Sequence, residues 1–333
     1  MLTFTPVKFN LVILSSFNML TRRHIRVKVM QCIYALIQSK EDSLEKQNKF
    51  LNVSIDNMYS LYLVLLSLLI EVHQHAKQQI QLSSKKYLAT DGHDFPFKEK
   101  FIANKLLQQL VNNTALKEEL ETRKLNNWYL NEEYVKLIYK DILESDRYLK
   151  YMHTKENSYE KDKELIVGLF KEIIAPNEKI YDYFEDDKLT WVDDIPIVNT
   201  YLLKHFKKAK ENSNPSFFLP SLLKDTEDMD YAKKLLSKTL LTNGVLEKEI
   251  EGKTPNWDKD RIAGIDAILL KMAICELLNF PSIPEKVTIN EYLEIAKEYS
   301  TPKSSIFING ILDKLVKEYK ETGKLNKIGR GLL

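Results

Sequence analysis

Apolar residues recur at helical spacing along most of the chain. In residues 22–40, Val29, Ile33, Leu36 and Ile37 fall on one face of a helix. No pair of runs alternates apolar and polar residues around a hairpin turn, so no β-sheet is expected. The pattern therefore predicts an all-α fold.

The same spacing predicts helices through the rest of the chain. Their expected ranges are 54–80, 98–110, 113–124, 131–155, 159–175, 231–249, 257–278 and 288–299, and a last helix begins at Thr301-Pro302. The helix expected at 54–80 contains a run from Leu61 to Ile70 that is apolar on nearly all sides. A membrane-spanning helix needs about 20 apolar residues, so this run is expected to be a core helix.

Particular residues mark where the last helices begin and end. Thr288 and Glu291 have the spacing of a capping box, which predicts a helix start at Thr288. Gly323 is expected to end the last helix, because glycine favours that position. Gly310 lies inside the same helix, where glycine costs about 1 kcal/mol relative to alanine. Close approach of a neighbouring helix or a ligand is the usual reason for such a glycine.

Polar and proline-containing stretches separate the helices. Residues 84–97 and 212–216 are expected to be loops, and 211–229 is the best candidate for a linker. Residues 165–206 resemble 231–274, since each has a helix, a tryptophan and then paired leucines. This similarity indicates either a degenerate repeat of a two-helix unit or chance.

Composition narrows the class of protein. The chain has 333 residues, which suggests about two domains, with 44% hydrophobic and 29% charged residues. Only 9 residues are glycine, so Gly-rich phosphate-binding loops have little room. The two cysteines, Cys32 and Cys275, lie in apolar helical runs and cannot form a disulfide framework. An intracellular, cytoplasmic protein with buried thiols is therefore expected.

Charge is distributed unevenly. The first 40 residues carry six basic residues and no acidic one, whereas residues 314–333 carry six basic and two acidic residues. The net charge is +2, so the residues between them carry a net charge of −8. If the fold brought the two ends together they would form one basic patch suited to phosphate. Ordinary solvated tails are the alternative.

The sequence contains few candidates for chemistry. The six histidines and two cysteines show no spacing typical of a zinc site, and no motif for a nucleophile or a nucleotide is present. The acidic clusters 185–187 and 193–194 are best interpreted as solvated turns. A non-enzyme without a cofactor or metal is expected.

Motifs near both ends resemble the NusB family. Ile289-Asn-Glu-Tyr-Leu-Glu-Ile-Ala-Lys297 and Phe307-Ile-Asn-Gly-Ile-Leu-Asp313 are similar to two of its helices. The helix of residues 267–277, with Ile283-Pro284 after it, resembles a third. Residues 22–34, Arg-Arg-His-Ile-Arg-Val-Lys-Val-Met-Gln-Cys-Ile-Tyr, resemble its arginine-rich first helix.

The resemblance implies a fold, a function and partners. It implies an all-α bundle of two subdomains that is not an enzyme. It implies binding of single-stranded boxA leader RNA together with NusE, a small-subunit ribosomal protein. Both would act in the RNA polymerase antitermination complex of ribosomal RNA operons.

The resemblance also implies a division of the chain. Its parts are an N-terminal extension without function (1–18), a basic first helix (19–40), a helical insertion (41–230), a C-terminal helical domain (231–320) and a basic tail (321–333). Compact members of the family have only a short stretch in place of the insertion, whose role the resemblance does not explain. Lys303 stands where many members carry an acidic residue.

RNA binding needs cations for phosphates and flat side chains for bases. The expected RNA-binding residues are Arg22, Arg23, Arg26, Lys28, Tyr34, Lys303, Ser304 and Phe307. The four cations of the first helix oppose its dipole, which suggests a role other than stability. Tyr34 and Phe307 are candidates for base stacking, although either could instead fill the core.

Two other classes stay open. One is a helical interaction scaffold or ribosome-assembly factor that has lost boxA specificity. The other is the targeting domain of an RNA cytosine methyltransferase, but no α/β nucleotide-binding domain with a catalytic cysteine is found. RNA affinity would separate the first class from an antitermination factor.

Overall fold

All regular structure in the described residues is helical, which confirms the all-α prediction. The computed structural model describes residues 19–39, 43–85, 99–251, 253 and 264–328. The first helices are α1 (Arg22–Ser39), α2 (Leu44–Lys85), α3 (Lys105–Val111), α4 (Thr114–Thr122), α5 (Asn127–Leu130), α6 (Glu132–Glu144), α7 (Asp146–His153) and α8 (Tyr159–Leu169). The remaining helices are η1 (Phe170–Ile174), α9 (Glu178–Asp187), η2 (Leu189–Trp191), α10 (Ile195–Lys208), η3 (Pro215–Phe218), α11 (Thr226–Leu241), α12 (Asn243–Glu251), α13 (Gly264–Asn279), α14 (Glu285–Tyr299) and α15 (Ser304–Glu321).

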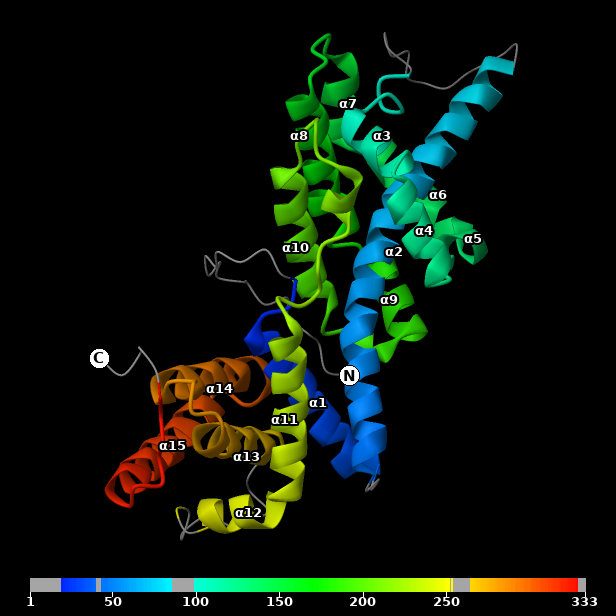
Figure 1. Ribbon diagram of the computed structural model, residues 1–333. Helices are drawn as coiled ribbons and strands as arrows, with labels where there is room; N and C mark the ends of the chain where they lie inside the picture. Colours follow the sequence, from blue (N-terminus) through cyan, green and yellow to red (C-terminus); the bar gives the residue numbers. More distant parts are fainter. Residues whose placement is uncertain (1–18, 40–42, 86–98, 252, 254–263, 329–333) are drawn as a thin grey trace.

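The helices form two lobes joined by α2 (Figure 1). One lobe holds α3 to α10, and the other holds α11 to α15. Helix α1 packs against α2, α11, α13 and α14, so it belongs to the second lobe while touching the helix that crosses both. The first helix of the chain thus lies beside the last third of the sequence.

Helix α2 is the core helix that its apolar run predicts. It is 42 residues long, and every residue from Leu61 to Ile70 is buried. Residues 44–82 are long and apolar enough to cross a membrane by length and composition. However, 78% of the apolar window is buried inside the protein, as in the core helix of a folded domain.

Several expected helices are interrupted. Residues 131–155 form α6 and α7, because Ser145 leaves the helical conformation (ψ 136°) and its hydroxyl accepts a hydrogen bond from the Tyr148 N–H. Residues 231–249 are divided between α11 and α12 at Thr242. The end of the expected 159–175 helix widens into the π-helix η1.

The capping predictions for the last two helices are wrong. Helix α14 begins at Glu285 after Pro284, so Thr288 lies inside the helix and is buried. Helix α15 begins at Ser304 without a side-chain cap. Gly323 does end the helical stretch, with φ 66°, as predicted. Gly310 has no atom within 4 Å of where a Cβ would stand, so no neighbouring helix explains it.

The segment 211–229 is packed onto the core, unlike a free linker. Phe218 is buried, and its carbonyl accepts a hydrogen bond of 3.0 Å from the Tyr62 hydroxyl. The Leu20 N–H donates to the Leu222 carbonyl at 3.0 Å, which ties this segment to the residues before α1. The extension 1–18, most of the 84–97 loop and the Trp257 part of the proposed repeat lie outside the described residues.

Both cysteines are buried free thiols, as expected. Burial raises the pKa of Cys32 to about 12 and that of Cys275 to about 11. Both thiols are therefore protonated near neutral pH and serve as apolar packing groups.

Candidate nucleic-acid interface

The first two arginines of α1 are held by carboxylates of the C-terminal lobe. The Arg22 Nε donates to Asp228 Oδ1 at 3.1 Å, and its guanidinium lies 5.3 Å from the Tyr231 ring centroid. The Arg23 Nε and Nη2 donate to the two carboxylate oxygens of Glu291 at 3.0 and 2.9 Å. Their side chains keep 44% and 33% of their surface exposed. Both guanidinium groups are thus oriented by the protein and still reach solvent.

Arg26 is buried, which corrects its expected contact with RNA. Its guanidinium donates two hydrogen bonds to Glu276, at 2.9 and 2.7 Å, and only 2% of its side chain is exposed. Glu276 also accepts hydrogen bonds from the hydroxyls of Tyr231 (2.5 Å) and Thr288 (2.8 Å). The Glu276 carboxylate raises the pKa of Arg26 despite the opposing effect of burial. Arg26 therefore joins α1 to α13 inside the protein.

Lys28 is also buried, so it too is withdrawn from the expected RNA surface. Its ammonium lies 2.6 Å from the Asp194 carboxylate, and the two side chains are 3% and 1% exposed. Burial raises the pKa of Asp194 to about 6, although Lys28 acts in the opposite direction. Asp194 lies at the turn before α10, so this ion pair connects α1 to the insertion.

Tyr34 lies on the surface, which settles the choice between core and exposed positions. It is 42% exposed and lies near the end of α1. It borders an open surface hollow where α1 meets the start of α13 and the junction of α14 with α15. The lining residues are Tyr34, Gln38, Gly264, Ile265, Tyr299, Ser300 and Thr301.

The start of α15 contributes one exposed cation and two covered residues. Lys303 is exposed, whereas Phe307 is half-buried against the core. Ser304 is buried, and its hydroxyl donates to Asp266 Oδ2 at 2.7 Å. Ser304 therefore anchors the loop before α15 and is covered from RNA in this structure.

The structure brings together part of the expected site. Tyr34 shares its hollow with Thr301, two residues before Lys303. Arg23 lies 11 residues before Tyr34, which is about three turns and ~16 Å along the same face of α1. Helix α14 runs beside both, since Glu291 binds Arg23 and Tyr299 borders the hollow. These exposed groups form one extended face.

Three lysines near the C-terminus make contacts within the C-terminal lobe. Lys320 pairs with Glu285 at 2.5 Å, and Lys324 pairs with Glu249 at 3.2 Å. The Lys327 ammonium donates to the carbonyl oxygen of Phe280 at 3.0 Å. These three lysines are therefore withdrawn from a basic patch of both ends, because carboxylates pair with Lys320 and Lys324 and carbonyl oxygens bind Lys327.

Sequence reasoning missed the carboxylates that hold the site. They are Asp194, Asp228, Asp266, Glu276 and Glu291. One of these carboxylates could have been found from the sequence, because Glu276 is an acidic residue inside the apolar run of α13. A buried carboxylate of this kind requires a counter-charge, and the cations of α1 are candidates to supply it.

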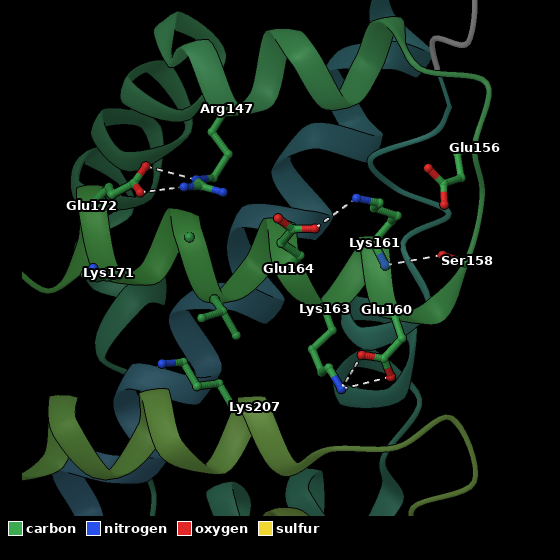
Figure 2. Close-up of a pocket in the computed structure, with 12 residues that line it drawn as sticks. Arg147, Glu156, Ser158, Glu160, Lys161, Lys163, Glu164, Lys171, Glu172 and Lys207 are labelled. Carbon is green, nitrogen blue, oxygen red and sulfur yellow. Dashed lines mark hydrogen bonds and ion pairs between the residues drawn. The ribbon is translucent and has the colours of Figure 1, made fainter.

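A second hollow lies away from these residues, beside α8 and α10 (Figure 2). Carboxylates neutralise most of its cations in the pairs Arg147–Glu172, Lys161–Glu164 and Lys163–Glu160. The Arg147 guanidinium lies over Gly168, where a Cβ would stand 2.2 Å from its Nε. The hollow has five cations against four carboxylates, so its net charge is small and it offers no strong attraction to phosphates.

The described part of the chain holds no group of His, Cys, Asp and Glu side chains able to bind a metal. The buried histidines have structural partners instead. The His73 Nε2 lies 2.9 Å from the Ile102 carbonyl oxygen, and the His205 Nε2 lies 2.7 Å from that of Phe217. These rings therefore join loops to helices.

Comparison with known proteins identifies the C-terminal lobe. Residues 198–317 match the model of the NusB family. This range begins within α10 and ends within α15, so it includes the carboxylates that hold Arg22, Arg23 and Arg26. No solved structure matches the chain.

Three curated relatives are named transcription antitermination protein NusB. The protein of Salinibacter ruber is 45% identical over 109 residues, which is 33% of this chain and 68% of the relative. That of Chloroherpeton thalassium is 41% identical over 128 residues (38% and 61%). That of Clostridium kluyveri is 41% identical over 93 residues (28% and 60%). The chain therefore spans about three fifths to two thirds of these relatives, and most of its own length lies outside the matches.

Proposed function

Because the chain belongs to the NusB family, we propose that it is a non-catalytic transcription antitermination protein of the cytoplasm. It binds single-stranded boxA-type leader RNA of ribosomal RNA operons together with the ribosomal protein NusE. It thereby joins the RNA polymerase antitermination complex. The observation that carries this proposal is the 45% identity to a relative named for that function.

The exposed face of α1 and the start of α15 is the proposed RNA surface. Tyr34 offers a ring for base stacking, and stacking of one base on an aromatic side chain is worth about 1–3 kcal/mol. Lys303 supplies an exposed cation near the same hollow. Arg22 and Arg23 extend the surface toward the N-terminus of α1, and Phe307 lies one turn into α15.

Buried polar residues position this surface. Arg26 fixes α1 against α13, Lys28 fixes it against the turn before α10, and Ser304 fixes the loop before α15. These three residues contribute by orientation, because their side chains are at most 3% exposed. Their replacement is expected to reduce RNA binding only as far as it displaces α1 or α15.

The exposed arginines bind RNA in competition with their own carboxylates. Asp228 and Glu291 already neutralise much of the charge on Arg22 and Arg23. A phosphate that contacts either guanidinium has to share it with that carboxylate. Affinity is therefore expected to fall as salt rises, with a slope that reflects few phosphate contacts.

Fluorescence anisotropy with a labelled boxA strand and a scrambled strand tests the proposal. We expect preference for boxA, strengthened by purified NusE and weakened along a series of rising salt concentrations. Equal weak binding of both strands, unchanged by NusE, would contradict the proposal. That result would instead support a helical scaffold that has lost boxA specificity.

A further inference from the structure

The region around α9 carries a concentrated negative charge. Residues 178–194 contain seven acidic and two basic residues, a net charge of −5. They comprise α9, η2 and the turn before α10. This segment belongs to the insertion and precedes the range that matches the NusB family model. Its surface therefore has no assigned role.

Buried contacts hold α9, η2 and α2 in a fixed arrangement. The rings of Phe184 and Trp191 pack with centroids 5.4 Å apart. The Trp191 Nε1 donates to the Asn57 carbonyl at 2.7 Å, and the Asn57 amide donates to the Thr190 hydroxyl at 3.2 Å. The exposed side of α9, η2 and α2 therefore has a fixed shape.

Each of the three elements carries a large apolar side chain that is exposed. Leu189 is 75% exposed, and Tyr181 is 38% exposed one turn before Phe184. Val53 is 48% exposed and precedes Asn57 by four residues, so it lies on the same face of α2. We define the α9 face by Val53, Tyr181 and Leu189 with the acids Asp182 and Glu185. Its apolar groups remain uncovered by the described residues.

The acids of the α9 face have no cation bound to them. Within the described ranges no lysine or arginine pairs with Asp182 or Glu185, whereas acids elsewhere in the same lobe, such as those of α8 and η1, are held in ion pairs. Burial and the carboxylates of Glu185, Asp193 and Asp182 raise the pKa of Tyr181. The nearby Lys188 is occupied, because its ammonium lies 4.6 Å from the Trp191 ring centroid. The negative charge of this face is therefore available to a partner.

We propose that the α9 face docks a lysine- or arginine-rich segment of a protein partner, which inserts an apolar side chain against Leu189. Uncovered apolar groups surrounded by charge of one sign suit a partner of the opposite sign, and the charge steers association. Nucleic acid is repelled by the same carboxylates. The residues of the α9 face differ from those of the proposed RNA surface, although Asp193 is close enough to act on both Tyr181 and Tyr299. The inference stands whether or not the chain binds boxA.

Labelled synthetic peptides test the docking surface in the absence of RNA. The first is an amphipathic helix of leucine and lysine, the second has serine in place of leucine, and the third has glutamate in place of lysine. We expect the full chain to bind the leucine–lysine peptide at least about tenfold more tightly than either of the others, a difference of about 1.4 kcal/mol. Equal binding of the lysine–serine peptide would overturn the proposal, because charge alone would then explain the attraction.

Matched variants locate the binding. D182N/E185Q and Leu189→Ser should each weaken the leucine–lysine peptide about tenfold. The controls are E118Q/E121Q on α4 and Leu241→Ser, since Leu241 is 72% exposed on α11 in the other lobe. The controls should leave affinity within about twofold. Equal losses in test and control variants, or RNA binding that depends on Leu189, would exclude a protein-docking role for this face.

Discussion

Glu276 is the side chain on which α1, α11, α13 and α14 converge. It is fully buried and accepts hydrogen bonds from Arg26, Tyr231, Thr288 and, at 3.3 Å, Tyr292. A buried ion pair gains stability only where further hydrogen bonds satisfy its atoms, and this carboxylate meets that condition. The Arg26–Glu276 ion pair explains why α1 lies against α13, although the two residues are 250 positions apart in the sequence.

Replacing Glu276 tests this network. Glu276→Gln removes the closest counter-charge of the buried Arg26 guanidinium and leaves only the Glu291 carboxylate, 3.8 Å away. The free energy of unfolding should therefore fall by about 3 kcal/mol. The double variant R26M/E276L should recover part of the loss, because it removes both charges but leaves the hydroxyls of Tyr231 and Thr288 without their acceptor. Urea unfolding followed by circular dichroism measures both values. A loss below about 1 kcal/mol in the single variant would contradict the account.

His205 makes stability depend on pH. Its ring is buried between Tyr201 and Phe217, with the Phe217 ring centroid 4.2 Å away. Burial lowers its pKa from 6.5 to about 4, and a hydrogen bond to the Phe217 carbonyl opposes this shift. Between pH 6.5 and 4 the unfolded chain binds a proton at this site and the folded chain does not. Acidification through this window therefore removes stability.

We expect the free energy of unfolding to fall by roughly 2 kcal/mol from this group between pH 7 and pH 5. His205→Gln keeps a donor for the Phe217 carbonyl and removes the titration, so its loss over the same interval should be smaller by that amount. His153→Gln on the surface is the matched control. Identical pH profiles for His205→Gln and the parent protein would exclude His205 as the origin.

At the scale of the helix, the glycine that follows α15 and the glycine inside α15 have different backbone conformations. Gly323 has a positive φ of 66°, which a side chain strains, whereas Gly310 is helical and surrounded by open space. Gly310→Ala should therefore raise the free energy of unfolding by about 0.5–1 kcal/mol, since alanine loses less backbone entropy. Gly323→Ala should lower it by about 1 kcal/mol. Thermal unfolding of both variants checks these signs, and destabilisation by Gly310→Ala would show a constraint absent from this structure.

Helix positions follow from the sequence more closely than helix ends do. Apolar periodicity predicted the core of α2 and most of the other long helices, but it gave no range for α9 or α10. The Thr288 cap failed because Pro284 starts α14 one turn earlier and the threonine hydroxyl is used by Glu276. The spacing of residues along one segment does not show that a carboxylate of another helix binds one of them.

The same limit applies to the candidate site. Tyr34 and Lys303 are exposed and lie near one hollow, as an RNA surface requires. Arg26 and Lys28 are turned inward, because Glu276 and Asp194 supply buried counter-charges. A run of cations on one helix does not reveal which faces are exposed until the packing of its neighbours is known.

At the scale of the whole molecule, α1 joins the lobe of α3 to α10 to the C-terminal lobe. Lys28 pairs with Asp194 and Gln31 donates to Asp193, both at the turn before α10. On another side of the helix, Arg22, Arg23 and Arg26 bind the C-terminal lobe. The turn before α10 therefore holds in place the helix that carries the proposed RNA-binding residues.

The affinity of Y34A/K303A for boxA RNA tests the central claim most directly. The matched control is Y129A/K140A, which removes an exposed tyrosine and lysine from the insertion. We predict that the test variant binds about tenfold or more weakly than the parent, because it loses one stacking ring and one phosphate contact. The control should bind as the parent does. Unchanged affinity in Y34A/K303A, or an equal loss in the control, would contradict the placement of the RNA surface on α1 and the start of α15.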